Sequence, residues 1–232
     1  MPPKPRTWDA RLARQMILPL VSTPVTPNHL TTVRLIVGLA CAWAFALGSY
    51  GWTNLGALLL VLSNVIDHAD GELARMSGKS SRFGHFYDLA ADSLVTVLLF
   101  VGIGAGVAQA AFASAHTGAP LAPSFASNFL HYATAAGTLA GISVAAIFFM
   151  RMRIEEIAGK AGTAQPSWGG FELEDILYLM PLVTLFNGLQ TFLMLAVIGA
   201  PAFALWITID YFRVTRRRDA HAAAVSKTPS RP

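Results

Sequence analysis

Four aspartates lie close together in a chain that is otherwise poor in charge, and their spacing suits metal chemistry. Asp67 and Asp70 are three positions apart and Asp88 and Asp92 four apart, so in helices each pair projects from one face. Charged side chains inside membrane helices are costly and usually mark a functional cavity. Four neighbouring carboxylates repel one another unless a counter-charge is present. The pattern therefore predicts a cation site.

The chemistry of these ligands indicates which cations fit. Carboxylate oxygens suit Mg²⁺, Mn²⁺ or Ca²⁺. The chain has one cysteine, Cys41, and no paired histidine ligands near the aspartates, which argues against zinc. Two such ions held roughly 4 Å apart are a known arrangement for clamping a phosphate during in-line displacement. We therefore expect Mg²⁺ or Mn²⁺, with two ions in the site.

Small residues and one arginine accompany the aspartates. Gly71 and Ala74 keep one helix face open, so that a bulky ligand can approach the backbone. Gly84 lets the two helix ends pack closely. Arg75 suits a phosphate oxygen, because its guanidinium is a fixed charge with several donors. These residues predict an anionic, phosphate-bearing ligand beside the metal.

The elements that position these residues are apolar enough to span a bilayer. Of 232 residues, 54% are hydrophobic and 13% charged, against roughly a quarter charged in soluble domains. Crossing a bilayer takes about 20 residues of helix. We predict an all-α, polytopic membrane protein of six transmembrane helices preceded by an N-terminal amphipathic interfacial helix. The spans are about 29–50, 53–74, 85–108, 128–150, 173–187 and 190–213.

The N-terminal and C-terminal segments are more polar than the predicted spans between them. Residues 8–22 mix basic and apolar side chains at helical spacing, which predicts the interfacial helix, although a solvated leader is the alternative. Asn28 is placed to cap the first span. Residues 1–218 form one membrane domain, and the polar segment 219–232 is predicted to be a disordered cytoplasmic tail.

Basic residues set the predicted topology. Nearly all of the 17 Lys and Arg residues fall in or beside the segments 1–28, 75–84, 151–172 and 214–232. Short cytoplasmic loops collect Lys and Arg, so both termini and the aspartates are predicted to be cytoplasmic. The net charge of +4 then indicates orientation and attraction to anionic lipid, and no nucleic acid is expected. Arg34 is read as an ion-pair partner of a carboxylate or as a snorkelling side chain.

Together the residues read Asp67-x2-Asp70-Gly71-x2-Ala74-Arg75-x8-Gly84-x3-Asp88-x3-Asp92. This resembles the signature of the CDP-alcohol phosphotransferase family, with each fixed position filled. The segment Pro27-Asn28-x-Leu30-Thr31 resembles the family's nucleotide-side segment, and six spans agree with its fold.

The resemblance implies a role for each residue. Asp67, Asp70 and Asp88 would hold two metal ions, and Asp92 would contact the second ion and act as the general base on the attacking alcohol. The family forms a phosphodiester and releases CMP, in phospholipid biosynthesis. The residues implied to bind the CDP moiety are Asn28, His29, Leu30, Thr31, Gly71, Ala74, Arg75, Ser81 and Gly84.

Several further residues have two readings. Arg151 and Arg153 resemble a basic segment that would bind a phosphate of the acceptor, or they anchor the span by their charge. His68, His85 and Tyr87 occupy variable positions of the motif, where packing or hydrogen bonding is expected, and contact with the acceptor is the alternative for His85. Acidic residues open the fifth predicted span, where they complement a helix N-terminus or contact the acceptor: Glu172, Glu174 and Asp175.

The predicted function is transfer of a phosphoalkyl group from a CDP-alcohol to a small alcohol acceptor. CDP-diacylglycerol is the preferred donor because the site should open to the bilayer, and a soluble CDP-linked polyol is the alternative. A divalent-ion transporter and a scaffold without catalysis are competing readings. The acceptor does not follow from these residues. The resemblance also implies a homodimer, and we place the protein in a bacterial inner membrane.

Overall fold

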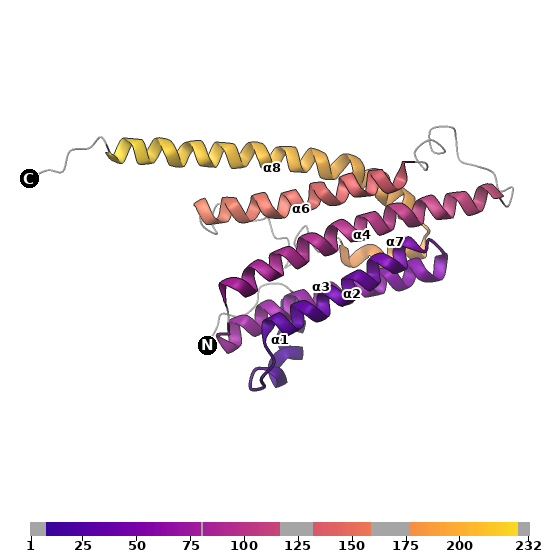
Figure 1. The fold of residues 1–232 in the computed structure, drawn as a ribbon, viewed down its shortest axis with the longest axis horizontal. Coiled ribbons are helices and arrows are strands. Elements are labelled where there is room, and N and C mark those ends of the chain that lie inside the picture. The colour runs from indigo at the N-terminus through magenta and orange to yellow at the C-terminus, as the bar shows by residue number, and fades with distance from the viewer. Residues whose placement is uncertain (1–7, 80, 117–131, 159–176, 227–232) are drawn as a thin grey trace, which may run out of the picture.

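The computed structural model describes residues 8–79, 81–116, 132–158 and 177–226, and these residues contain helices and no strand. The predicted all-α fold is therefore confirmed. In chain order the elements are α1 (Trp8–Ile17), η1 (Leu18–Leu20), α2 (Pro27–Ala46), α3 (Tyr50–Ser77), α4 (Arg82–His116), α6 (Ala133–Ala158), α7 (Met180–Leu185) and α8 (Leu189–Ser226). Figure 1 shows the long helices running side by side along one axis.

Helix α1 lies where the sequence predicts an N-terminal helix. Its buried residues Ala13 and Ile17 pack against Ala69 and Leu73 of α3, so one face of α1 is bound to the helix that carries the first aspartates. Met16, on another side of α1, stays half exposed. Burial of these apolar groups fixes the N-terminal segment beside the end of α3.

Helix α2 begins two residues earlier than predicted, and its cap differs. Thr26 has the extended backbone of an N-cap, and Pro27 occupies the first turn, where its missing N–H is not needed. The Thr26 N–H donates to Nδ1 of His29 at 3.3 Å. The prediction that Asn28 caps this helix is wrong, because Pro27 already has helical geometry and places Asn28 inside the first turn.

Helices α2, α3 and α4 form the central layer, and small residues let two of them approach closely. A Cβ on Gly102 of α4 would collide with the carbonyl oxygen of Ala42 in α2, and a Cβ on Gly106 with that of Phe45. Side chains at these positions would therefore force α2 and α4 apart. The main apolar core lies between the helices near these glycine contacts. It includes Phe45, Leu60, Leu99, Ile103 and Leu193.

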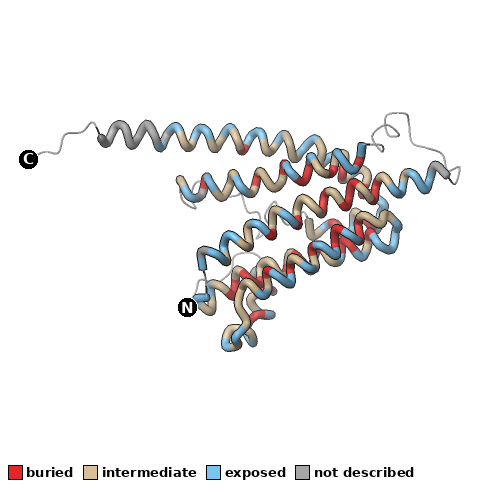
Figure 2. The backbone as a smooth tube through the Cα atoms, viewed as in Figure 1, coloured by how far each residue is buried: buried red, intermediate tan, exposed pale blue. Residues whose placement is uncertain are grey.

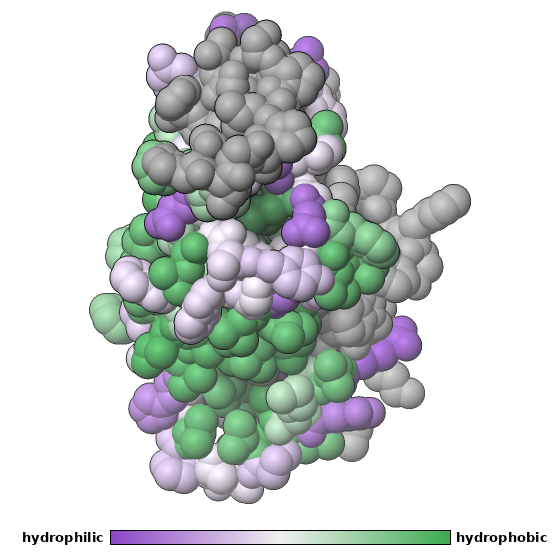
Figure 3. All heavy atoms as spheres, turned by 90° about the vertical axis from the view of Figure 1, so that its right-hand side faces the viewer, coloured by the Kyte–Doolittle hydropathy of each residue, from purple (hydrophilic) through white to green (hydrophobic). Residues whose placement is uncertain are grey.

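Helices α6 and α8 form an outer layer on α4. Ile147 and Ile154 of α6 pack with Ile207 of α8. Figure 2 shows buried residues along α2, α3, α4 and the inner side of α6, whereas α8 has few. Large apolar side chains stay exposed on α8, among them Leu195, Ile198 and Leu205. Figure 3, which views the end reached by the α2–α3 turn, shows hydrophobic side chains over much of the surface.

Four of the described helices are long and apolar enough to cross a membrane: Pro27–Ala46, Phe83–Ser114, Ala133–Ile154 and Leu189–Arg216. The six-span count is therefore not confirmed. Helix α3 has 28 residues but contains several charged ones towards its end, which lowers its hydropathy. In the described part of the predicted span 173–187, α7 has six residues, far below the roughly 20 needed to cross.

The C-terminal part of the chain differs from its prediction. Helix α8 continues to Ser226, so the segment predicted to be disordered from 219 is helical over its described part. Alanines at positions 220 and 222–224 explain the difference, because alanine has the highest helix propensity of the amino acids. Residues 227–232 lie outside the described residues.

Candidate metal and nucleotide site

The aspartates meet where α3 ends and α4 begins, which is the end of the bundle that also holds the start of α2 (Figure 1). One carboxylate oxygen from each of Asp67, Asp70 and Asp88 lies within 4.8 Å of the other two. Asp70 is buried, whereas Asp67 and Asp88 are partly accessible. The antiparallel pairing of α3 and α4 thus gathers carboxylates that are far apart in sequence, as the motif spacing predicts.

Asp92 does not belong to this group of three and instead contacts Arg34 of α2. The Arg34 Nη1 atom forms an ion pair with Asp92 Oδ1, another with Asp67 Oδ1 at 2.7 Å, and a longer one with Asp88 Oδ1 at 3.5 Å. The Arg34 side chain is only 8% exposed. Of the two readings of Arg34, the structure supports the ion pair, and it shows three carboxylate partners rather than one.

The donor set fits divalent cations. All the candidate ligands are carboxylate oxygens, which Mg²⁺ and Mn²⁺ prefer. Among the described residues, Oδ1 of Asp88 and Oδ1 of Asp92 are buried without a hydrogen-bond partner. Both atoms face the Arg34 guanidinium. Buried polar atoms without a hydrogen bond call for a further partner, such as a cation. The residues therefore suit a metal that the carboxylates would hold.

Thr31 connects α2 to the same carboxylates. Its hydroxyl donates to Asp70 Oδ2 at 2.8 Å, and both residues are buried. The same oxygen lies 3.2 Å from the carbonyl of Pro27. Thr31 was expected beside the CDP moiety. In the structure its hydroxyl orients a candidate metal ligand, because a carboxylate with one fixed oxygen can present the other in one direction.

Asn28 and Gly84 are in contact at the junction of α2 and α4. A Cβ placed on Gly84 would lie 2.7 Å from Asn28 Oδ1 and 3.1 Å from Ser81 Oγ. The Ser81 hydroxyl accepts a hydrogen bond from the Gly84 N–H at 2.9 Å, as a helix cap does. Gly84 is therefore required for the close approach of Asn28, and Ser81 already uses its hydroxyl to start α4.

We expect Gly84→Ala to weaken nucleotide binding more than it weakens the fold. The added methyl group must displace the end of the Asn28 side chain, which can rotate, so the free energy of unfolding should change by less than about 1 kcal/mol. Loss of a positioned polar contact should raise the donor KM by about tenfold. Thermal unfolding and steady-state kinetics measure the two effects. An unchanged KM would contradict a role of this junction in nucleotide binding.

Arg75 lies over Gly71 and is held by a buried glutamate. Its Nε and Nη2 atoms donate to Glu72 Oε1 at 3.1 and 2.6 Å, and the Glu72 side chain is 5% exposed. A Cβ on Gly71 would contact the guanidinium at 3.5 Å. Sequence reasoning missed Glu72, although an acidic residue three positions before an arginine on a helix is a signal for such a pair.

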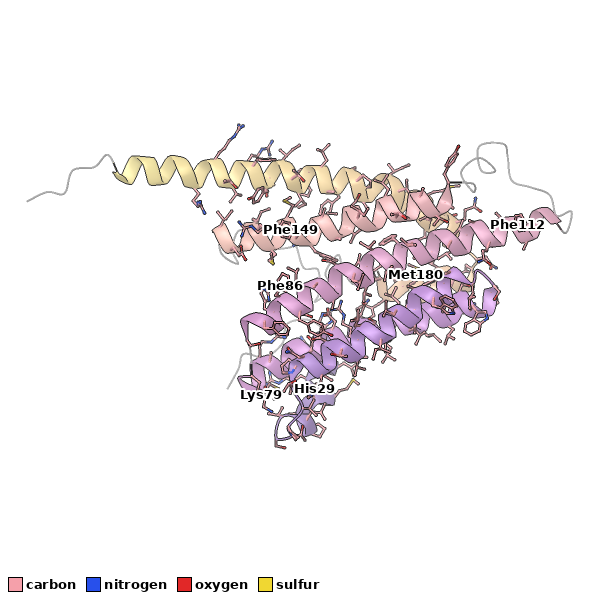
Figure 4. The ribbon with its side chains drawn as sticks, in the orientation of Figure 1. His29, Lys79, Phe86, Phe112, Phe149 and Met180 are labelled. Carbon is pink, nitrogen blue, oxygen red and sulfur yellow. The ribbon has the colours of Figure 1, made fainter. Side chains whose placement is uncertain are left out.

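Lys79, which follows α3, contacts the segment before α2. Lys79 Nζ donates to the carbonyls of Thr23 and Val25 at 2.8 and 3.3 Å. Figure 4 shows Lys79 and His29 at the same end of the bundle. His29 is exposed and engaged with Thr26, and Leu30 packs with the apolar cluster under α1. In the segment from Asn28 to Thr31, therefore, Asn28 faces α4 and Thr31 faces α3.

The remaining predicted residues have local partners. Arg153, at the end of α6, pairs with Glu156 at 2.5 Å, and Arg151, two positions before Arg153, is partly buried. The Nδ1 atom of His68 lies 2.9 Å from the Asn64 carbonyl, and the Tyr87 hydroxyl lies 3.1 Å from Thr32 Oγ1. Ala74 is partly buried, and His85 is exposed. Glu172, Glu174 and Asp175 lie outside the described residues.

The fold and the site together define a helical protein with membrane-spanning helices that gathers carboxylates suited to a cation at one end of its bundle. The family model for CDP-alcohol phosphatidyltransferase matches residues 24–209, so the chain belongs to that family. This stretch includes the carboxylates, Arg34, Thr31 and both helix ends that form the site.

Curated relatives support the same family. Over 87 residues the chain is 34% identical to an archaetidylinositol phosphate synthase of Pyrococcus horikoshii, covering 38% of this chain and 45% of the relative. Over 69 residues it is 38% identical to a CDP-diacylglycerol–glycerol-3-phosphate 3-phosphatidyltransferase of Rickettsia felis, covering 30% and 38%. A bifunctional IPC transferase and DIPP synthase of Aquifex aeolicus is 33% identical over 79 residues, covering 34% and 18%. The matched part spans less than half the length of each relative.

Proposed function

We propose that this protein transfers a phosphatidyl group from CDP-diacylglycerol to a small alcohol and releases CMP. The observation that carries the proposal is the convergence of Asp67, Asp70 and Asp88 within 4.8 Å, in a chain that belongs to the CDP-alcohol phosphatidyltransferase family. Names of the relatives agree with phospholipid synthesis. A divalent-ion transporter is a weaker reading, because family membership indicates a transferase.

The chain's own residues have distinct parts in this reaction. A carboxylate oxygen of Asp92 accepts the proton of the acceptor hydroxyl. The acceptor oxygen then bonds to the phosphorus that carries diacylglycerol, and the bond from that phosphorus to the CMP oxygen breaks. Two divalent ions, when held by Asp67, Asp70 and Asp88, would supply positive charge for the phosphate oxygens. Arg75, oriented by Glu72, binds a phosphate of the departing CMP.

A lipid donor is supported by the surroundings of the site. Ile36 in α2 is 62% exposed and Phe86 in α4 is 69% exposed. Each lies two positions from a site residue, Arg34 or Asp88, and therefore on the opposite side of its helix. Phe83 is likewise exposed one turn from Tyr87. Large apolar side chains exposed on the outward faces of the helices that carry the site are suited to acyl chains. A soluble CDP-linked polyol would gain nothing from them, so CDP-diacylglycerol is the preferred donor.

The proposed topology places the site on the cytoplasmic side of the membrane. Basic residues cluster at the same end of the bundle as the carboxylates: Arg75 and Lys79 at the end of α3, Arg151 and Arg153 at the end of α6, and Arg213, Arg216 and Arg218 in α8. Such clusters are typical of cytoplasmic ends. We include α3 as a further span, since 28 residues of helix reach about 42 Å. Helix α1 would then lie at the cytoplasmic interface.

CMP release tests the proposal. The full chain, purified in detergent, is mixed with Mn²⁺ or Mg²⁺, CDP-diacylglycerol and one alcohol at a time, including glycerol phosphate, inositol phosphate and serine. We expect CMP to appear only with metal, donor and one of the acceptors. The acceptor that gives a signal names the product, and cross-linking of the active protein tests the homodimer that the family resemblance implies.

Two other outcomes are informative. CMP release from a CDP-linked polyol but not from CDP-diacylglycerol would replace the donor and keep the reaction. No CMP release with any pair, together with no binding of CDP-diacylglycerol in calorimetry, would overturn the transferase proposal.

A further inference from the structure

Lys79 contacts a part of the chain that is remote from it in sequence. It follows Gly78, whose φ of 66° ends α3 in the left-handed conformation. Its Nζ atom donates to the carbonyl oxygens of Thr23 at 2.8 Å and Val25 at 3.3 Å, which lie 56 and 54 positions earlier in the chain. The ammonium group therefore links the end of α3 to the segment before α2.

The segment that Lys79 contacts is restricted by proline. Pro24 and Pro27 lack an N–H group and fix their own φ angles, so the chain around Val25 has few conformations. The carbonyls of Thr23 and Val25 precede α2 and must find partners outside its hydrogen-bond ladder. Two carbonyls that converge on one nitrogen suit an ammonium group, which has three donors and no acceptor.

The apolar side of the same segment packs against α3. Leu20 and Val25 lie on the cluster that contains Leu73 of α3. The Thr23 hydroxyl donates to the Leu20 carbonyl at 2.7 Å and accepts from the Val25 N–H at 3.3 Å. The segment is thus held by α3 on its apolar side and by Lys79 on its polar side.

The position of this segment determines where α2 starts. Helix α2 begins at Pro27, two residues after the second carbonyl that Lys79 binds. Asn28 and Thr31 lie in its first turns, and Thr31 donates to Asp70 Oδ2 at 2.8 Å. Backbone hydrogen bonds keep these turns rigid, so a displaced start of α2 moves both side chains together. Lys79 lies at the end of the bundle where α2 starts (Figure 4).

We propose that Lys79 is a positioning residue for the donor, which fixes the start of α2 so that the segment from Asn28 to Thr31 is in place before the CDP moiety binds. The inference rests on the proposed function, in which this segment contacts the nucleotide. Without Lys79 the segment is displaced part of the time, and only the remaining fraction of molecules binds donor. The apparent dissociation constant of the donor rises by the inverse of that fraction, while bound donor restores the native position.

Lys79→Met removes the ammonium group and keeps a side chain of similar length. For the full chain in detergent, we expect the KM for CDP-diacylglycerol to rise by about tenfold, which corresponds to roughly a tenth of the molecules being in the binding position. Calorimetry should show the same loss of donor affinity. The kcat for CMP release should stay within about twofold of native, a separation that general loss of stability would not produce.

Lys79→Arg is the conservative rescue variant, because a guanidinium also carries a positive charge and several donors. Its KM should lie within about threefold of native. Arg216→Met removes a positive charge from an exposed residue of α8 and should leave KM and kcat unchanged. Lys79→Ala repeats the test with a second side chain, so that poor folding of one variant does not decide the outcome.

Hydrogen exchange tests the position of the segment without donor. The N–H groups of Val25, Thr26 and His29 are hydrogen-bonded in this structure. In Lys79→Met they should exchange at least about tenfold faster than in the native protein, because the segment opens more often. Saturating CDP-diacylglycerol should return their exchange to the native rate.

These measurements let the two proposals fail separately. Unchanged exchange in Lys79→Met and Lys79→Ala overturns the positioning role of Lys79, even if the native protein releases CMP. Faster exchange with an unchanged donor KM overturns its role in donor binding, and faster exchange with a raised KM supports the inference. If the native protein neither binds CDP-diacylglycerol nor releases CMP, the transferase proposal falls, and exchange without donor still decides whether Lys79 fixes the start of α2.

Discussion

Asp92→Asn is expected to lower kcat for CMP release by roughly 100- to 10,000-fold, the range in which a general base contributes. An amide has nearly the size of a carboxylate but cannot take the acceptor proton. Asp92 lies outside the group of three carboxylates that can share an ion. Mn²⁺ and CDP-diacylglycerol should therefore bind the variant within about threefold of native affinity, as measured by calorimetry.

Asp210→Asn is the matched control, because it makes the same change in a partly exposed residue of α8. It should leave kcat and both affinities unchanged. If Asp92→Asn retained more than a tenth of the native kcat, Asp92 would not be the base. A large loss of Mn²⁺ affinity would instead assign Asp92 to the metal ligands, as the family resemblance also implies.

Asp67→Asn is expected to weaken metal and donor binding together. Asp67 offers an oxygen to the group of three carboxylates and lies 2.7 Å from Arg34 Nη1. Removing its charge takes away one of the three candidate metal ligands and one of the three ion-pair partners of Arg34. Changes around a metal ligand cost 10- to 100-fold in affinity, so loss of the ligand itself should lower Mn²⁺ affinity by at least about 100-fold.

Donor affinity should fall with the metal, because the diphosphate of the donor needs the cations for charge balance. Calorimetry with CDP-diacylglycerol, with and without Mn²⁺, measures this dependence for the native protein and for Asp67→Asn. Equal donor affinity in Asp67→Asn and Asp92→Asn would contradict the division of roles between these two aspartates.

The helical fold and the location of the site follow from residue patterns along the chain. Apolar stretches of the length needed to cross a bilayer predict the long helices α2, α4, α6 and α8. The spacing of Asp67, Asp70 and Asp88 on adjoining helices predicts their convergence, because a short connection makes α3 and α4 antiparallel neighbours. Each of these features depends on residues that are close in sequence, so it can be predicted from the sequence.

The structure differs from the predictions where competing local preferences or span length decide the outcome. Both Thr26 and Asn28 can cap a helix, and the choice of Thr26 depends on Pro27 taking helical geometry. The polar segment after 219 contains enough alanine to extend α8 to Ser226. Over the described residues, α7 is too short to be the fifth span that its apolar composition suggested.

By itself the sequence determined an all-helical protein with long apolar helices and a cluster of carboxylates where two of its helices meet. Only the tertiary structure decided how α2 completes that site. Thr31 reaches Asp70, Asn28 meets Gly84, and Arg34 lies among three of the four aspartates. Periodicity shows which face of a helix is polar, but partners from different helices depend on how the helices are rotated and packed together.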